Sequence, residues 1–241
     1  MSGHSKWSNI KRRKGAEDQR RGKVFSKMAR LIAVAVKEGG STDPESNAKL
    51  RLAIDRARAE NMPKENIQRA IDSAIKKREA IEELMLEGYG PGGVAILVEA
   101  VTDNRQRTIQ EIKNVFQKAG GSLAEPGAVI FQFEKKGSIE IKNPHNEEKL
   151  LSLIDLGVDD FEEVDSRLIL LVSASKIDEL KNKVSAAGFK VWRADLIMEP
   201  KNLVSLDNES KTKSALTLLQ TLENHDDVQR VFANLDPSQI E

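Results

Sequence analysis

The sequence has no cysteine, few aromatic residues and no long apolar run. The lack of cysteine excludes disulfides, cysteine-based zinc sites and thiol nucleophiles, and it suits a reducing compartment. No stretch approaches the roughly 18 to 20 apolar residues that a membrane helix needs. The positively charged start is not followed by the apolar segment of a secretory signal. We therefore expect a soluble, cytoplasmic protein, with 241 residues sufficient for two or three domains.

Charge is unevenly distributed along the chain. Residues 1–78 contain 20 Lys/Arg against 9 Asp/Glu, and residues 79–241 contain 18 Lys/Arg against 29 Asp/Glu. The near-zero total therefore hides a basic part joined to an acidic part. An excess of one sign costs self-repulsion unless a partner neutralises it, and the commonest partner of a basic excess is a polyanion.

The most basic stretch is Gly3–Lys14, which packs five cations and one indole into twelve residues. Lys and Arg reach phosphate oxygens and release counterions, and an indole stacks on unpaired bases. The alternative is a solvated tail whose Trp7 packs into the following helices. On the first reading, the candidate nucleic-acid-binding residues are Lys6, Trp7, Lys11, Arg12, Arg13, Lys14, Arg20, Arg21, Lys23, Lys27 and Arg30.

Apolar periodicity predicts three helices in the first third of the chain, at residues 20–37, about 46–60, and from Pro63 onward. The first is expected to end at Gly39-Gly40 and to carry Arg20, Lys23, Lys27 and Arg30 on a separate, cationic face. Each is apolar on one face only, so a three-helix bundle is expected. After residue 79 helices and strands alternate with mixed connections, which favours two small α+β units with antiparallel pairing over one parallel sheet. Strands are expected at 94–101, 128–133, 138–141, 168–172, 189–198 and 228–232, and helices at 102–119, 147–156, 176–187 and 210–223.

Several long strings carry a family resemblance. GHSKWSNIKRRK, RGKVFSK and KLRLAIDRARAENMPKENIQRAI come first, followed by EGYGPGGVAILVEAVTDNRQRT, GGSLAEPGAVIFQFEKKG and LENHDDVQRVFANLD. Together they resemble the YebC/PmpR-like family of probable transcriptional regulators, related to the mitochondrial translational activator of cytochrome c oxidase. Arg12, Leu86 and Phe131 depart from the residues common there, conservatively in charge or bulk.

The resemblance implies an α+β protein of three domains around a cleft, with the third domain inserted in the second. On this basis we expect a helical bundle at 1–78, a discontinuous domain at 79–135 plus 201–241, and an inserted domain at 136–200. It also implies DNA binding in some members and ribosome-linked translation support in others. It implies no enzymatic reaction, cofactor or small-molecule substrate.

Two glycine- or arginine-containing segments suggest phosphate binding but have simpler readings. Gly88–Gly93 precedes a strand and lacks the Lys of a phosphate loop, so we expect a turn or hinge joining the bundle to the next domain, with Tyr89 over the bundle core. Arg105 and Arg107 follow Asp103 and Asn104 at a predicted helix start. Helix capping with surface ion pairs is the simpler account there, and the two arginines remain secondary nucleic-acid contacts.

Acidic residues cluster at Asp159, Asp160, Glu162 and Glu163, and again at Asp226-Asp227. We expect solvated acidic surface, which either engages a basic protein partner at the first cluster or keeps the acidic half off nucleic acid. His4, His145 and His225 lack the spacing of a metal motif, and no catalytic elbow is present. No metal site and no enzyme are expected.

Three functions remain in order of preference. The first is a DNA-binding transcriptional regulator, with the second and third helices forming a helix-turn-helix-like pair across Asn61–Pro63. The second is a translation factor that uses the same cations on ribosomal RNA, where Trp7 stacking gains weight. The third is a protein-interaction scaffold that uses the acidic part.

Overall fold

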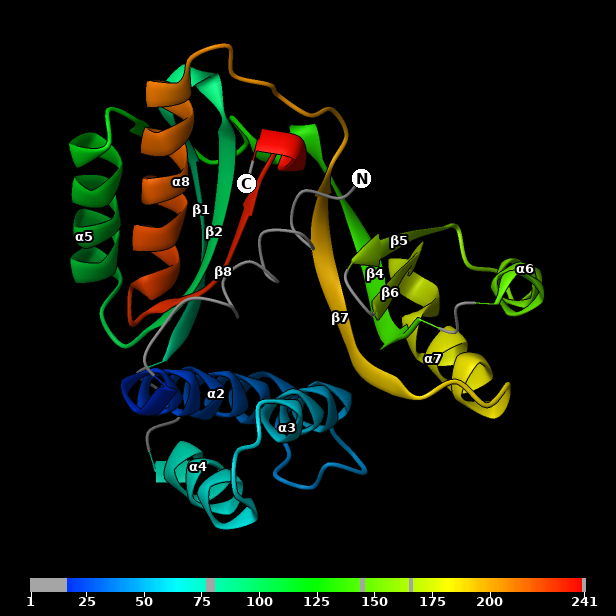
Figure 1. Cartoon of the computed structure of the whole chain (residues 1–241). Coiled ribbons are helices and arrows are strands. Elements are labelled where there is room, and N and C mark those ends of the chain that lie inside the picture. Colours follow the sequence, from blue (N-terminus) through cyan, green and yellow to red (C-terminus); the bar gives the residue numbers. More distant parts are fainter. Residues whose placement is uncertain (1–16, 77–80, 144–145, 165–166, 240–241) are drawn as a thin grey trace. The chain divides into compact units, whose positions relative to one another are not determined.

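The computed structural model describes residues 17–76, 81–143, 146–164 and 167–239. They form two compact units, one of residues 133–203 and the other of residues 15–132 with 204–241. The described residues contain seven α-helices and two antiparallel sheets, so the expected mixed α+β class is confirmed (Figure 1). The three-domain boundaries given above stay a prediction. No helix in these ranges is both long and apolar enough to cross a membrane.

The first part of the larger unit is helical, as the apolar periodicity predicts. Helix α2 contacts both of the helices that follow it. Ile32, Leu50 and Ala57 are fully buried in their shared core, with Ile67 and Ile71 from the last helix packed beside them. The helices are α2 (Glu17–Gly39), α3 (Ala48–Ala59) and α4 (Lys64–Lys76).

Asn47 joins the end of α2 to the start of α3. Its side-chain oxygen accepts the Leu50 N–H, which makes it the N-cap of α3. Its amide nitrogen donates to the carbonyls of Ala35, near the end of α2, and of Ser41, just beyond it, so the side chain ties the end of α2 to the start of α3. A Cβ at Gly39 would clash with this side chain. The Gly39-Gly40 stop read from the sequence is therefore both a helix end and a site of close approach.

Sheet A completes the larger unit. Its strands run antiparallel in the order β3-β1-β2-β8, so the C-terminal strand pairs with β2. Figure 1 shows α5 and α8 side by side on one face of this sheet. The elements are β1 (Glu82–Tyr89), β2 (Ala95–Thr102), α5 (Arg105–Lys118), β3 (Ser122–Ala124), α8 (Glu209–Asn224) and β8 (Val228–Ala233).

The glycine-rich run is a hairpin turn, and the expected hinge from the bundle is wrong. Gly88 lies inside β1, where a Cβ would clash with Phe116 of α5, so only glycine lets the helix approach this closely. The chain reverses between Gly90 and Val94, where the Gly90 N–H donates to the Val94 carbonyl at 2.8 Å. Tyr89 donates to the Ala128 carbonyl within this unit, so it does not cap the helical core.

The expected strand at 128–133 is a turn followed by a short 3-10 helix, Ile130–Gln132, and only Phe133 begins a strand. The cause is Glu87, a buried carboxylate on β1. It accepts the backbone N–H groups of Gly127, Val129 and Ile130 at 2.6 to 2.8 Å. Those donors are therefore not available for pairing with a neighbouring strand.

Sheet B belongs to the smaller unit and is also antiparallel, in the order β5-β6-β4-β7. Ile139, Leu170 and Val172 are fully buried against Leu153 of α6 and Val184 of α7. The elements are β4 (Phe133–Lys142), α6 (Glu147–Asp155), β5 (Asp160–Val164), β6 (Arg167–Ser173), α7 (Ile177–Ala186) and β7 (Val191–Pro200).

Candidate nucleic-acid interface

Only part of the predicted basic surface falls on residues that the structure describes. Helix α2 includes Arg20 and Arg21, but their side chains lie outside the described part, as does the whole segment that precedes the helix. Lys23, Lys27 and Arg30 are described. The predicted residues outside the described ranges are Lys6, Trp7, Lys11, Arg12, Arg13 and Lys14.

Lys23, Lys27 and Arg30 share one face of α2, because spacings of four and three residues return to the same side of a helix. The opposite face carries Met28 and Ile32 into the helical core. The helix therefore separates an apolar side from a cationic side, as the sequence predicts. Because packing holds the apolar side, the direction of the three cations is fixed within this unit.

All three cations reach the segment 223–227, where α8 ends and the chain turns into β8. Lys27 Nζ donates to the Glu223 carbonyl at 2.6 Å. Arg30 donates to the Asp226 carbonyl and pairs with the Asp227 carboxylate at 3.0 Å. Lys23 Nζ lies 3.8 Å from Asp226 Oδ1. Carbonyl and carboxylate oxygens of the protein itself thus contact the cations that are predicted to bind phosphate. Nucleic-acid binding by these residues stays a prediction.

Asp227 is a buried carboxylate that joins three elements. Thr108 Oγ1 donates to its Oδ2 at 2.6 Å and Arg107 donates to the same oxygen at 2.9 Å. Arg30 pairs with the other oxygen, and the Asp227 carbonyl accepts the Val101 N–H. Burial alone would raise the pKa of this carboxyl, but the bonds from Thr108 and Arg107 and the charge of Arg30 outweigh it and lower the pKa.

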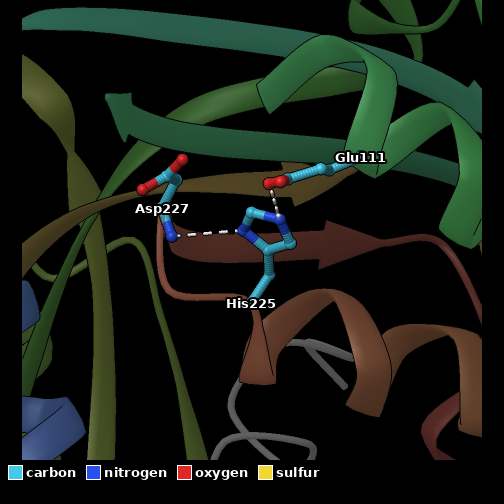
Figure 2. Close-up of side chains that lie close together, drawn as sticks. All are labelled: Glu111, His225 and Asp227. Atoms are coloured by element: carbon cyan, nitrogen blue, oxygen red, sulfur yellow. Dashed lines mark hydrogen bonds and ion pairs between the residues drawn. The ribbon is translucent and has the colours of Figure 1, made fainter. Parts of the chain in front are cut away.

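His225 and Glu111 extend this cluster, as Figure 2 shows. The Asp227 N–H donates to His225 Nδ1 at 3.1 Å, and Nε2 lies 3.0 Å from Glu111 Oε2. Because Nδ1 accepts, the neutral ring carries its proton on Nε2 and donates to Glu111. Among the described residues, Glu111, His225 and Asp227 are the one group whose ligand-type atoms lie within 4.8 Å of one another.

The arrangement fits a hydrogen-bonded structural cluster better than a cation site. Both ring nitrogens of His225 are engaged, and a metal at Nδ1 would have to displace the Asp227 N–H. Arg30 and Arg107 already pair with the Asp227 carboxylate, so a divalent ion there would have to compete with two cations. This cluster could not be predicted from the sequence, because Glu111 and His225 are 114 positions apart.

Arg105 and Arg107 lie in the first turn of α5, whose N-cap is Asn104. Arg105 NH1 is 3.7 Å from Glu82 Oε2, and Arg107 bonds Asp103 as well as Asp227. Capping with ion pairs, the simpler of the two readings, is therefore present. Contact of these arginines with nucleic acid stays a prediction.

The expected acidic surfaces are only partly solvated. Asp159, Asp160 and Glu163 are exposed, whereas Glu162, in the middle of β5, is buried. Asp226 is exposed but its neighbour Asp227 is buried. The prediction of solvated acidic surface is therefore wrong for Glu162, because strand residues alternate between two faces, and for Asp227, because Thr108 and two arginines surround its carboxylate. A protein partner at Asp159, Asp160, Glu162 and Glu163 stays a prediction.

The turn between α3 and α4 has the geometry of a helix end. Asn61 adopts a left-handed φ of 59°, and the Met62 N–H returns to the Ala57 carbonyl. The exposed side of α4 mixes charges, since Gln68 bonds Asp72 and Arg69 bonds Asn66. A helix-turn-helix reading of this pair stays a prediction.

Comparisons with known proteins cover nearly the whole chain. Residues 5–77 match the family model described as the TACO1/YebC protein N-terminal domain, and residues 81–235 match the TACO1/YebC second and third domain. A "Probable transcriptional regulatory protein" of Chloroflexus aurantiacus is 49% identical over 243 residues, covering 98% of this chain and 96% of the relative. One of the same name from Dictyoglomus turgidum is 45% identical, covering 100% and 98%.

A solved structure is also similar. The crystal structure of a conserved hypothetical protein from Aquifex aeolicus matches with a TM-score of 0.84 and 40% sequence identity, and the match covers 91% of each chain.

Proposed function

Because this chain belongs to the TACO1/YebC family, we propose that it is a non-enzymatic regulatory protein that binds DNA through its basic N-terminal part. Its relatives in Chloroflexus and Dictyoglomus are named as probable transcriptional regulatory proteins, which favours DNA as the target. The same cations would also read the backbone of RNA, so the test below compares the two polymers.

The observation that carries the proposal is the separation of charge. Residues 1–78 hold eleven more bases than acids, and the remaining residues hold eleven more acids than bases. A protein that binds sugar-phosphate chains gains from such a basic part, while the acidic part keeps the rest of the surface off the polymer.

The architecture of α2 supports the proposal. The helix packs Met28 and Ile32 into the core and directs Lys23, Lys27 and Arg30 to the other side. Cations held on a packed helix lose less conformational freedom on binding than cations on an unstructured chain. Residues 1–30 contain ten Lys/Arg, so the basic sequence that precedes α2 adds further phosphate contacts.

The test measures how affinity for nucleic acid depends on salt. If the chain neutralises about five phosphates, log K on duplex DNA falls with log salt at a slope of about −4 to −5. Replacing Lys11, Arg12, Arg13 and Lys14 with Gln should weaken binding of a 30-base-pair duplex and make the slope shallower by about 3 to 4. The matched control replaces four exposed lysines elsewhere with Gln, namely Lys113, Lys118, Lys190 and Lys211.

Equal losses in the two variants would contradict the proposal, since binding would then follow net charge alone. A salt slope near zero for the wild-type chain would also contradict it. An RNA hairpin bound more tightly than the duplex at the same salt would move the target from DNA to RNA. In each assay the variants are first compared with wild type by circular dichroism to confirm that they fold.

A further inference from the structure

The cationic face of α2 is occupied from within the protein. Lys23, Lys27 and Arg30 all contact one short stretch, the segment 223–227. These three residues are also the described members of the predicted phosphate-binding set. These contacts therefore bear on how nucleic-acid binding at this surface is regulated.

The segment offers negative potential of two kinds. Helix α8 ends at Asn224, and its last turn contains no basic residue. The carbonyls at a helix C-terminus carry a partial negative charge, which nearby cations stabilise. Here Lys27 of α2 supplies that cation, by its bond to the Glu223 carbonyl. Asp226 and Asp227 then add two carboxylates directly after the helix end.

Asp227 gives the segment a fixed position. Thr108 and Arg107 hold one of its oxygens, which leaves the other to face Arg30. Asp226 is not held in this way, since its side chain is 70% exposed and lies 3.8 Å from a Lys23 that is itself 58% exposed. The contact thus has a rigid part at Arg30 and a weak, exposed part at Lys23.

The oxygens of this segment resemble those of a nucleic-acid backbone. Carbonyl and carboxylate oxygens accept hydrogen bonds from Lys and Arg as phosphate oxygens do. The contacts span eight residues of α2, from Lys23 to Arg30, about 10 Å along the helix at 1.5 Å per residue. Phosphates of one DNA strand are spaced by about 3.4 Å along the duplex axis, so this length matches about three phosphate steps.

We propose that the segment 223–227 is an internal competitor for nucleic acid on the cationic face of α2. The three cations bind either the segment or the phosphates of a polymer. Phosphate binding therefore requires Lys23, Lys27 and Arg30 to leave the segment, while the Thr108 and Arg107 bonds keep Asp227 in place. This inference rests on the proposed function, because it concerns the same surface.

Competition by the segment lowers the affinity for nucleic acid but does not abolish binding. Exposed ion pairs such as Lys23 with Asp226 are weak and are screened by salt. A polymer that also contacts other cations of the N-terminal part gains from many phosphates at once and displaces the segment. A short or weakly charged anion does not. The segment thus favours extended polyanions over isolated phosphate groups.

The test reverses the charge of Asp226 in the full chain. Asp226→Lys places an ammonium group beside Lys23 and Arg30, so the segment repels the face that it now covers. We expect duplex DNA to bind Asp226→Lys about five- to tenfold more tightly than it binds wild type at low salt. The matched control is Asp207→Lys, which makes the same charge change at the exposed residue before α8, about 24 Å away along the helix. The control should change affinity less than about twofold.

A second measurement follows the segment directly. Amide hydrogen exchange of residues 223–227 should become faster when saturating duplex is added to wild type, because the segment loses its contacts with Lys27 and Arg30. Exchange in Asp226→Lys should already be fast without DNA. Asp226→Asn serves as a milder variant, with a gain of about two- to threefold expected.

The outcomes separate this inference from the proposed function. If wild type and Asp226→Lys bind the duplex equally, or if Asp207→Lys gains as much, the internal competitor is wrong and the proposed function stands. If neither protein binds duplex or RNA at any salt, both are wrong. If exchange of the segment slows when DNA binds, the segment is part of the interface and competition is excluded.

Discussion

The two sheets have the same number of strands and the same antiparallel pairing, but they use charged residues differently. At sheet A, Glu87 and Asp227 are buried; Glu87 accepts three backbone N–H bonds, and Asp227, just before β8, accepts two side-chain hydrogen bonds and pairs with Arg30. In sheet B, Arg167 pairs with Glu140 and Arg193 with Asp195 on the strands themselves; both arginines are partly exposed, although Glu140 is buried. Glu87 and Asp227 therefore fix loops and helices onto sheet A, whereas Glu140 and Asp195 of sheet B join neighbouring strand positions, as Glu99 does with Arg230 in sheet A.

This difference predicts unequal sensitivity. A buried carboxylate that is removed leaves its donors without an acceptor, and each unpaired buried group costs more than the bond contributed. A partly exposed pair that is broken leaves groups that water can solvate. The comparison can be tested by removing one charge from each sheet and by changing the pH.

The largest effect is expected for Asp227→Ala. The substitution leaves Arg30 and the Thr108 hydroxyl without their shared acceptor, and it should lower the free energy of unfolding of the larger unit by about 3 to 5 kcal/mol. Hydrogen exchange of the β2 amides during urea unfolding measures this loss. Asp226→Ala, at the exposed neighbour, is the control and should cost less than about 1 kcal/mol. Equal losses for the two would show that burial at 227 does not matter.

A smaller effect is expected from acid. Burial would raise the pKa of Glu87, but three backbone N–H bonds outweigh it and lower that pKa, as partners also do for Asp227. A carboxyl with a lowered folded pKa stabilises the fold above its unfolded pKa of about 4 and loses this contribution as pH falls. In sheet B, burial raises the pKa of Glu199, so protonation there favours the folded form.

Sheet A should therefore lose more stability than sheet B between pH 5 and 3. Glu83, in β1, opposes this trend because burial raises its pKa. Urea unfolding followed by exchange at β2 and at β6 gives the two pH profiles, and Glu87→Gln should flatten only the first. Parallel profiles, with Glu87→Gln without effect, would remove the distinction between the sheets.

Much of the fold can be predicted from the sequence because it depends on the pattern of nearby residues. The apolar spacing of α2, its stop at Gly39-Gly40 and the helix at α8 each follow from residues a few positions apart. Strand β1 was missed because its acidic residues and Gly88 look unsuited to a strand. Glu87 is in fact buried, and the partners that make this tolerable are 40 to 43 positions away.

The candidate site shows the same limit more clearly. The cationic face of α2 was predicted from spacing alone, but its contact with the segment 223–227 joins residues 196 positions apart. Asp226 and Asp227 are identical and adjacent in sequence, yet one is exposed and the other is buried under Thr108 and two arginines. Which of them carries structure is decided by the register of β8 against β2, which no single-sequence pattern encodes.

The smallest effect is expected for Arg167→Gln in sheet B. Arg167 pairs with Glu140 and lies over the Trp192 ring, 4.4 Å from its centroid. Arg167 is partly exposed but Glu140 is buried, so the loss should cost about 1 to 2 kcal/mol, below the loss at Asp227, where two arginines and a hydroxyl lose an acceptor. Trp192 fluorescence in a Trp7→Phe background follows unfolding of this sheet and also reports removal of the cation from the ring. Arg167→Lys keeps the charge but not the planar group, so it separates the two contributions. A loss of unfolding free energy as large as that of Asp227→Ala would mean that charged residues contribute equally to the stability of the two sheets, which would contradict the expected difference.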